Sequence, residues 1–479
     1  MVYLNYARNS LHERKNDQQY DRWLNFYWTE VASSHPSRNF SFSIPLSTTK
    51  FPLTYKTLLS YASKMKIRII FLGLLLVIAF FLGGCQKRTF SLVLPDYQKP
   101  QKDYNRHLPP GEQALRKITD PNQIPDYTLA CTDTDRLKEA IANSLKYMAK
   151  PSSKKFYPHG DITHEQAVRS LRELENLVTL GLSPQQMNAV LRERFDTYIS
   201  VGCDDQGTVL FTGYYTPIFD GSSIRKDRFK YPLYKPPADL LKGPDGTILG
   251  QRGPDGQIRQ YPSREDIQKS NALAGNELVW LSDPFEIYIV HVQGSAKIRM
   301  PSGQIETVGY AAHNGWEYQS IVQKMIADGK LSDKNINLKA MIDYFKAHPD
   351  EVDMYVNKNP RFVFFKSEKG DPRGSLNEPV IPFRTIATDK TIYPRAMFAY
   401  VSVDLDRSVG FALDQDTGGA IRAAGRCDVY MGVGDHAAEL AGGTYREGRL
   451  YYLFIKPDGD QIVGYSGQKD KKLFKIKGN

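Results

Sequence analysis

The spacing of apolar residues divides the chain into a helical stretch followed by a strand-rich one. Between residues 137 and 148 apolar positions recur every three or four residues, which predicts an amphipathic helix. Thr163 begins a second helical pattern that runs through Leu174. A third helix is predicted from Ser183–Gln186, a capping box with proline at the first helical position. These three helices are expected to be scaffold.

After residue 203 the pattern becomes that of strands. Residues 208–217 form an apolar β run, and residues 285–295 alternate in a way that predicts another strand. Gly-Pro-Asp-Gly occurs at residues 243–246 and again at 253–256, which predicts two hairpin turns. Helices are expected before Gly329 and over residues 338–347, a strand within 357–365, and only β structure from residue 383 onward.

The segment Gln415–Gly434 contains two carboxylates among glycines and small residues. This composition disfavours a helix and predicts strand, turn, strand, with Asp416 and Asp428 brought together by the backbone. A third carboxylate, Asp389, ends the short β-like run that begins at Arg384. Three acids in one β-rich region form a candidate site.

An uncharged apolar run follows a basic start near the N-terminus and ends in Gly-Gly-Cys. The length of this run, residues 69–82, is typical of a signal peptide rather than a membrane span. Leu82–Cys85 resembles the bacterial lipobox, so residues 65–84 are expected to be a lipoprotein signal peptide, with acylation at Cys85. Gln86 after the cysteine implies, by this resemblance, lipid anchoring on the periplasmic face of the outer membrane.

Residues 1–64 precede this signal and are expected to be an upstream over-extension of the reading frame, with translation starting at Met65. The polar, proline-rich residues 85–125 are predicted to be a tether. A length of 479 residues then leaves room for two folded domains.

Composition narrows the choice of chemistry. The net charge of +10 is moderate for this length and comes without clustered basic runs, so no nucleic-acid partner is expected. The scattered histidines and four cysteines show no metal-ligand spacing, and we expect neither a metal nor a cofactor. No GxSxG motif is present. Carboxylate chemistry remains.

The carboxylates allow three interpretations from their sequence context. Asp416 begins the only Asp-Thr-Gly triplet, whereas an aspartic protease needs two. A partly buried, protonated aspartate could instead protonate a glycosidic oxygen. Turn aspartates that accept backbone N–H bonds are the non-catalytic alternative. Gln293–Ser295 and Tyr310–Trp316 add polar and aromatic groups of the kind that suits sugar hydroxyls.

Six motifs together make the chain similar to the family of membrane-bound lytic murein transglycosylase A. In chain order they are FTGYYTP (211–217), VQGSAKI (292–298), GYAAHNGWEY (309–318), NPRFVFF (359–365), RTIATD (384–389) and DTGGAI (416–421) followed by CDVYMGVG (427–434). One departure is Arg422-Ala-Ala-Gly, where the family more often has Lys-Gly.

The resemblance implies a mainly β protein with flanking helices, an α+β fold. Its catalytic domain would be a double-psi β-barrel, formed by residues 126–218 and 366–479, with a second β-barrel domain inserted at 219–365 and a substrate groove between them. It also implies peptidoglycan glycan strands as the substrate, and it raises the cell-wall synthesis machinery as a partner to test.

The resemblance further implies which residues act. Asp428 would be the catalytic acid/base, with Asp416 and Asp389 in support. Groove residues by the same transfer are Thr212, Tyr214, Gln293, Gly294, Ser295, Asn314, Gly418 and Gly419.

The implied activity is that of a peptidoglycan lytic exotransglycosylase, a glycosidic bond lyase for cell-wall remodelling and turnover. It would cleave the β-1,4 bond between N-acetylmuramic acid and N-acetylglucosamine and leave 1,6-anhydromuramic ends. A non-catalytic peptidoglycan-binding lipoprotein and a water-using muramidase remain alternatives, and exolytic versus endolytic preference stays open.

Overall fold

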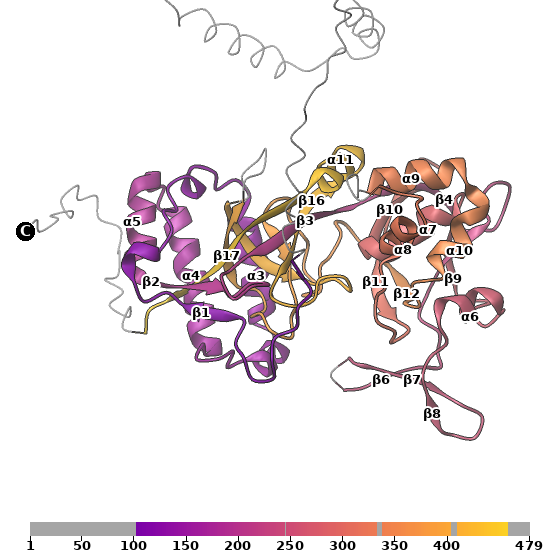
Figure 1. Cartoon of the computed structure of the whole chain (residues 1–479), viewed down its shortest axis with the longest axis horizontal. Coiled ribbons are helices and arrows are strands. Elements are labelled where there is room, and N and C mark those ends of the chain that lie inside the picture. The colour runs from indigo at the N-terminus through magenta and orange to yellow at the C-terminus, as the bar shows by residue number, and fades with distance from the viewer. Residues whose placement is uncertain (1–101, 245, 333–337, 404–409, 458–479) are drawn as a thin grey trace, which may run out of the picture. The chain divides into compact units, whose positions relative to one another are not determined.

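A computed structural model describes residues 102–457 of the chain, apart from 245, 333–337 and 404–409. The described part contains a β-barrel domain and a second domain inserted into it (Figure 1). The chain leaves the barrel after β3 (Val209–Thr216) and passes directly into β4 (Ile218–Ser222) of the insert. It returns after β12 (Val363–Glu368), the last strand of the insert.

Six strands close the barrel. Around the ring they are β17 (Tyr445–Ile455), β14 (Phe398–Val403), β15 (Gly410–Asp416), β13 (Thr385–Ala387), β16 (Arg426–Val433) and β3, which pairs with β17 again. The pairs β13/β15 and β16/β3 are parallel and the other four are antiparallel. The expected barrel is therefore confirmed, and β15 and β16 are the two strands predicted within Gln415–Gly434.

Three helices lie beside the barrel, as the apolar spacing predicts (Figure 1). They are α3 (Leu137–Met148), α4 (His164–Thr179) and α5 (Pro184–Arg194). The predicted caps are present: Thr163 accepts a hydrogen bond from the backbone N–H of Gln166, and Ser183 and Gln186 form a reciprocal capping box. Buried leucines and isoleucines of these helices share one hydrophobic core with the barrel, and each fully buried side chain contributes roughly 2 kcal/mol.

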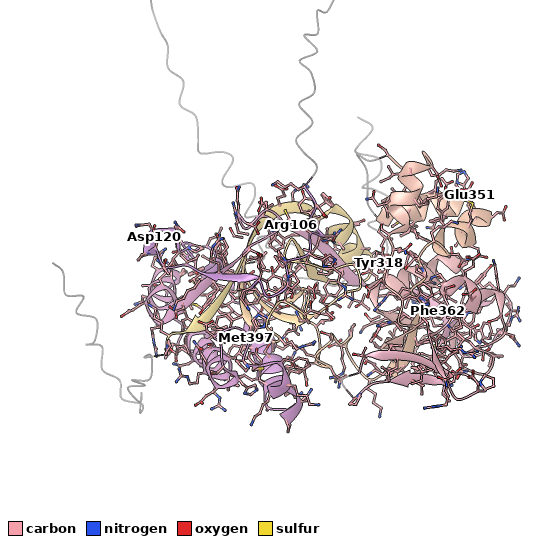
Figure 2. The ribbon with its side chains drawn as sticks, turned by 60° about the horizontal axis from the view of Figure 1, so that its bottom comes forward. Arg106, Asp120, Tyr318, Glu351, Phe362 and Met397 are labelled. Carbon is pink, nitrogen blue, oxygen red and sulfur yellow. The ribbon has the colours of Figure 1, made fainter. Side chains whose placement is uncertain are left out.

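The stretch from residue 102 to 125, predicted to be part of a tether, instead belongs to the folded domain. Its strand β1 (Leu115–Lys117) pairs with β2 (Phe195–Ser200), which extends the sheet beyond β17. Arg106, labelled in Figure 2, donates from Nε to the carbonyl oxygen of Cys203 at 2.6 Å. Prolines in this stretch therefore shape an ordered path over the barrel domain. Short 3-10 turns lie at Pro121–Gln123, Ala130–Thr132 and Pro151–Phe156.

The insert is built on a six-stranded sheet. Its strand order is β12, β11 (Ile305–His313), β10 (Ser295–Arg299), β4, β9 (Glu277–Leu281) and β5 (Tyr231–Tyr234). The outer strands β12 and β5 contact each other, and Leu233, Val363 and Phe365 share the core enclosed by the sheet. Both predicted hairpins are present, formed by β6 (Leu240–Lys242), β7 (Ile248–Arg252) and β8 (Ile258–Arg259).

One predicted strand of the insert is wrong. Residues 285–295 alternate like a strand, but the structure has the helix α7 (Pro284–Gln293) there. Asp283 caps the helix by accepting from the backbone N–H of Phe285, Pro284 occupies the first turn, and Gly294 ends the helix at φ +79°. The helix α7 is buried on several sides, so its apolar residues do not follow the period of an amphipathic helix. Its ends are instead marked by the cap residue, the proline and the glycine.

Further helices of the insert are α6 (Arg264–Lys269), α8 (Ile321–Ala327), α9 (Leu338–Ala347) and α10 (Val352–Val356), with a 3-10 turn at Pro349–Glu351. In the barrel domain, the expectation of only β structure after residue 383 is wrong at one place. The helix α11 (Asp435–Gly443) follows β16. It was not predicted because glycines at its C-terminal end disfavour a helix. Met397, labelled in Figure 2, lies in the core of the barrel domain, while Phe362 lies in the insert.

Candidate active site

Four strands of the barrel bring the predicted carboxylates into one row. Asp428 of β16 is the register partner of Thr212 on one side and of Ala387 on the other. Ala387 is in turn the partner of Asp416 on β15. The short strand β13 thus separates the two aspartates by a single residue with a small side chain. The backbone delivers both acids to one place, as the composition of Gln415–Gly434 predicts.

Asp428 contacts two polar side chains, those of Thr212 and Arg426. Its Oδ1 accepts a hydrogen bond from the hydroxyl of Thr212 and lies 3.8 Å from Nη2 of Arg426. The same Arg426 nitrogen donates to the Thr212 hydroxyl oxygen at 3.2 Å. Burial raises the pKa of the Asp428 carboxyl above its usual range, while Arg426 and the Thr212 hydroxyl act in the opposite direction. With its side chain 16% exposed, Asp428 remains open to solvent.

Asp416 is held by several donors. Its Oδ2 accepts from the Tyr214 hydroxyl at 2.8 Å, and its Oδ1 accepts from the backbone N–H groups of Ser375 and Thr417, both at 2.8 Å. Burial raises the pKa of Asp416, and these hydrogen bonds together with the Lys390 ammonium oppose that rise. Donors to both oxygens fit a carboxylate that serves as an anion more than as a proton donor.

Asp389 acts on the loop that joins the other two acids. Its Oδ2 accepts from the backbone N–H of Ala423 at 3.0 Å, and its Oδ1 accepts from the N–H and hydroxyl of Thr391 at 3.0 and 2.6 Å. Ala423 has φ +66°, a left-handed conformation that costs free energy for a residue with a side chain. Asp389, only 4% exposed, therefore stabilises the loop 417–425 that precedes Asp428.

A buried ion pair, which was not predicted from the sequence, lies beneath the site. Lys390 pairs with Asp414, and the Asp414 carboxylate also accepts from the hydroxyls of Thr388 and Tyr452, both at 2.7 Å. Burial lowers the pKa of Lys390, against the effect of Asp414. A charge on an otherwise apolar inward-facing strand position, Asp414 in Phe-Ala-Leu-Asp-Gln, was the signal that could have revealed the pair.

A cavity of about 630 Å³ adjoins the carboxylate row. Thr212 and Arg426, which both contact Asp428, line one part of it, and Gln293 lines another. Other lining residues come from the chain before β1, from α8, α9 and α11, and from the start of β17. The site is thus open to a ligand much larger than water.

The remaining predicted groove residues occupy different places. Tyr214 reaches Asp416, and Gln293 accepts through Oε1 from the backbone N–H of Tyr215 at 3.0 Å. Gly294 ends α7, and the Ser295 hydroxyl lies 3.2 Å from that of Thr216, so Ser295 connects the insert to β3. Gly418 and Gly419 lie in the loop 417–425.

A Cβ on Gly419 would lie 3.2 Å from Nε of Arg361 and 3.4 Å from Cβ of Tyr318. The loop 417–425 therefore contacts the insert closely, and a side chain at position 419 would require the Arg361 side chain to shift.

Asn314 is corrected to a structural residue. It is fully buried, and its amide nitrogen donates to the carbonyl oxygens of Pro262 and Pro360, both at 2.9 Å. Its Oδ1 accepts from the N–H of Phe362 at 2.8 Å. A side chain with these bonds and no exposure cannot line a groove; it ties together two proline-containing segments of the insert.

Cys131, Cys203 and Cys427 are buried free thiols, and Cys427 packs in the barrel core. Cys85, the signal peptide and residues 1–64 lie outside the described residues. In the part of the chain that the structure covers, no group of three potential metal ligands is found, and no helix has the length and apolar character to cross a membrane.

Known proteins resemble both domains. The model of the "MltA specific insert domain" family matches residues 210–366, and that of the "3D domain" family matches residues 384–454. Membrane-bound lytic murein transglycosylase A of Vibrio cholerae is 30% identical over 267 residues, covering 53% of this chain and 68% of the relative. The Escherichia coli protein of that name is 28% identical over 279 residues, covering 56% and 71%.

Solved structures agree with the fold. The membrane-bound lytic murein transglycosylase of Agrobacterium tumefaciens matches with a TM-score of 0.61 at 26% identity, covering 71% of this chain and 98% of that one. The E. coli MltA structure with bound chitohexaose matches in fold with a TM-score of 0.56 at 22% identity, covering 75% and 97%.

The barrel, its carboxylate row and these similarities define a lytic transglycosylase. The chain belongs to the family of membrane-bound lytic murein transglycosylase A.

Proposed function

We propose that the enzyme cleaves the β-1,4 bond between N-acetylmuramic acid and N-acetylglucosamine in peptidoglycan and leaves 1,6-anhydromuramic ends. The observation that carries this proposal is the environment of Asp428, a partly exposed carboxyl with a raised pKa beside a large cavity. Relatives of this chain carry the name murein transglycosylase, and one structure of the E. coli protein contains chitohexaose. Both support a glycan strand as the substrate.

Asp428 supplies both proton transfers. Its carboxylic acid donates a proton to the glycosidic oxygen as the bond from that oxygen to C1 of the muramic residue breaks. The resulting carboxylate then takes the proton from the C6 hydroxyl of the same residue, whose oxygen forms the new bond to C1. Atoms balance without water, and Asp428 returns to its protonated form. A raised pKa favours this cycle because it keeps the acid protonated at higher pH.

Three residues near Asp428 position it or stabilise the charge that develops during the reaction. The hydroxyl of Thr212 orients the carboxyl through a hydrogen bond to Oδ1. Asp416, with donors on both oxygens, provides negative charge near the developing oxocarbenium ion. Asp389 holds the loop before Asp428 through Ala423. A single acid/base suffices because the nucleophile belongs to the substrate, in contrast to glycosidases that need two carboxylates.

We also propose that the mature protein is anchored to the periplasmic face of the outer membrane by lipid on Cys85. The lipobox-like Leu82–Cys85 and the "membrane-bound" name of the relatives support this. Intact mass of the native protein tests it: a diacylated chain that begins at Cys85 is expected, and a chain that retains residues 1–64 would contradict it.

The catalytic assignment is tested with purified sacculi. Asp428→Asn is expected to lower the release of muropeptides by about 10³-fold or more, with unchanged circular dichroism. Thr179→Val, at an exposed position on α4, serves as a control and should retain full activity. Full activity of Asp428→Asn would overturn the assignment, and binding without release by the native enzyme would favour a non-catalytic peptidoglycan-binding protein.

A further inference from the structure

Two arginines from different domains lie at the loop 417–425. Arg361, which precedes β12 in the insert, donates from Nη1 to the carbonyl oxygen of Trp316 at 3.0 Å. Arg422, in the loop 417–425 of the barrel domain, lies with Nη2 3.8 Å from the carboxylate of Glu317, the next residue along. Nε of Arg361 also lies 3.2 Å from a Cβ built on Gly419. Both guanidinium groups therefore gather around Trp316 and Glu317.

The negative charge around this pair is incomplete. Within the described ranges, no carboxylate lies within 4.0 Å of Arg361, and Nε of Arg422 is buried without a hydrogen-bond partner. The contacts of Arg422 with Glu317 and with Oδ1 of Asp389, at 3.8 and 4.0 Å, are longer than hydrogen bonds. Asp389 already serves Thr391 and Ala423, and the Glu317 side chain is 80% exposed.

The neighbouring histidine reports the same excess of positive charge. The pKa of His313 falls to about 3, first because the ring is buried and then because of Arg361, Arg422 and Lys242. Burial, followed by the charge of Arg422, also lowers the pKa of Arg361. An anion bound at this place would oppose the part of each shift that comes from the neighbouring cations.

The backbone segments that carry the two cations are held in place. Arg264, which is fully buried, donates from Nη2 to the carbonyl oxygen of Arg361 at 2.7 Å and from Nε to that of Asn359 at 3.1 Å. The residue after Arg422 is Ala423, which Asp389 fixes. Because both backbones are restrained, little backbone entropy remains to be lost when an anion binds.

We propose that Arg361 and Arg422 form a carboxylate-binding subsite for the acidic substituents of the glycan strand. In murein, every second sugar carries a lactyl ether, to which peptides with free carboxylates are attached, whereas chitin carries no such groups. Guanidinium groups bind carboxylates through paired hydrogen bonds. The subsite adjoins the predicted acids, because Nη1 of Arg422 lies 4.0 Å from Oδ1 of Asp389. This inference rests on the proposed function and names what distinguishes its substrate.

Glu317 gives the subsite a testable competitor. Its exposed carboxylate occupies the side of Arg422 that a ligand carboxylate would approach, and it can turn into solvent. Glu317→Gln should therefore tighten the binding of an acidic fragment. A merely structural role of the two arginines gives no reason for such a gain.

The experiment measures binding by calorimetry with three probes. They are a disaccharide–peptide fragment of murein, the same fragment with its carboxylates converted to amides, and uncharged chitohexaose. Arg422→Gln and Arg361→Gln are each expected to weaken binding of the acidic fragment about 10-fold, with chitohexaose affected less than about 2-fold. Arg259→Gln, on the exposed hairpin of the insert, is the matched control and should change neither.

The outcomes separate the two proposals. Selective loss for the acidic fragment, together with tighter binding in Glu317→Gln, supports the subsite. Equal loss for all three probes, or no loss for any, overturns it. The Tm of Arg422→Gln and of Arg361→Gln shows whether either variant has a folding defect. If the native enzyme releases nothing from sacculi, the proposed function fails, while the dependence of binding on the ligand's carboxylates still decides the subsite.

Discussion

The hydroxyl of Thr212 donates a hydrogen bond to Oδ1 of Asp428, and the two residues are register partners on the parallel strands β3 and β16. Strand pairing therefore sets the geometry of the acid and its donor, which does not depend on a flexible loop. The chain passes from β3 directly into the insert, so the strand that carries the partner of Asp428 also connects the barrel domain to the insert.

Thr212→Val tests this link. Loss of the hydroxyl removes a hydrogen bond that stabilises the ionised form of Asp428, so the pKa of Asp428 should rise. We expect kcat to fall roughly 10-fold and the alkaline limb of the pH–rate profile to move upward. An unchanged profile with unchanged kcat would show that the hydroxyl does not act on Asp428.

Arg426→Gln removes the cation that lies 3.8 Å from Asp428. An adjacent cation favours the ionised acid and so opposes the raised pKa of Asp428, and the loss of this cation should raise the pKa of Asp428 further. The expected result is activity that persists to higher pH, measured as kcat/KM on soluble glycan strands. Arg426→Lys, which retains a charge, serves as the control and should shift the profile less. A downward shift in Arg426→Gln would contradict the electrostatic role of Arg426.

Asp428→Asn should make the protein more stable at neutral and higher pH. The native pKa of Asp428 lies above its unfolded value, so the stability contributed by the bound proton is complete below the unfolded pKa and is lost as the pH rises through the native pKa. Above that pH the native protein holds a desolvated carboxylate, which asparagine replaces by a neutral amide. Each unit of raised pKa corresponds to about 1.4 kcal/mol.

The stability difference is measured as Tm at several pH values. A gain of a few degrees in Asp428→Asn is expected at about pH 8 and should shrink as the pH falls toward about 4. Asp205→Asn, at an exposed acid, provides a comparison without desolvation. A Tm of Asp428→Asn at or below that of the native enzyme across the whole range would argue against a raised pKa.

Asn314→Ala separates a structural residue from a ligand contact. The substitution removes the Asn314 partner of the Pro262 carbonyl and of the Phe362 N–H in a buried site, while the Pro360 carbonyl keeps the backbone N–H of Arg264 as a donor, and the loss should destabilise the protein by about 3 kcal/mol. At a temperature where the variant is folded, KM for glycan strands should be unchanged. An increased KM with a native Tm would return Asn314 to the groove.

The sequence predicted most where a local signal coincides with the tertiary structure. Thr163 and Ser183 begin their helices as their caps indicate, and Gln415–Gly434 folds as strand, turn, strand. The apolar spacing did not predict the helix α7, because this helix is buried on several sides and its apolar residues do not recur with the helical period. The prediction also failed before residue 115, where proline-rich sequence follows an ordered path against the barrel.

Side-chain roles were less predictable than backbone elements. Asp416 and Asp428 were brought together as expected, because β13 places only Ala387 between them. Asn314 resembled a sugar ligand because polarity in a motif does not reveal burial. The Lys390–Asp414 pair and the encounter of Arg361 with Arg422 depend on contacts between residues distant in the chain, which no spacing in the sequence records.

The mass of the glycan ends released from purified sacculi tests the central claim most directly. If the C6 hydroxyl of the muramic residue is the nucleophile and Asp428 the sole acid/base, every new muramic end is a 1,6-anhydro ring, lighter by one water than a reducing end, and Asp428→Asn releases none. Reducing ends in the products of the native enzyme would show that water is the nucleophile and would contradict the mechanism.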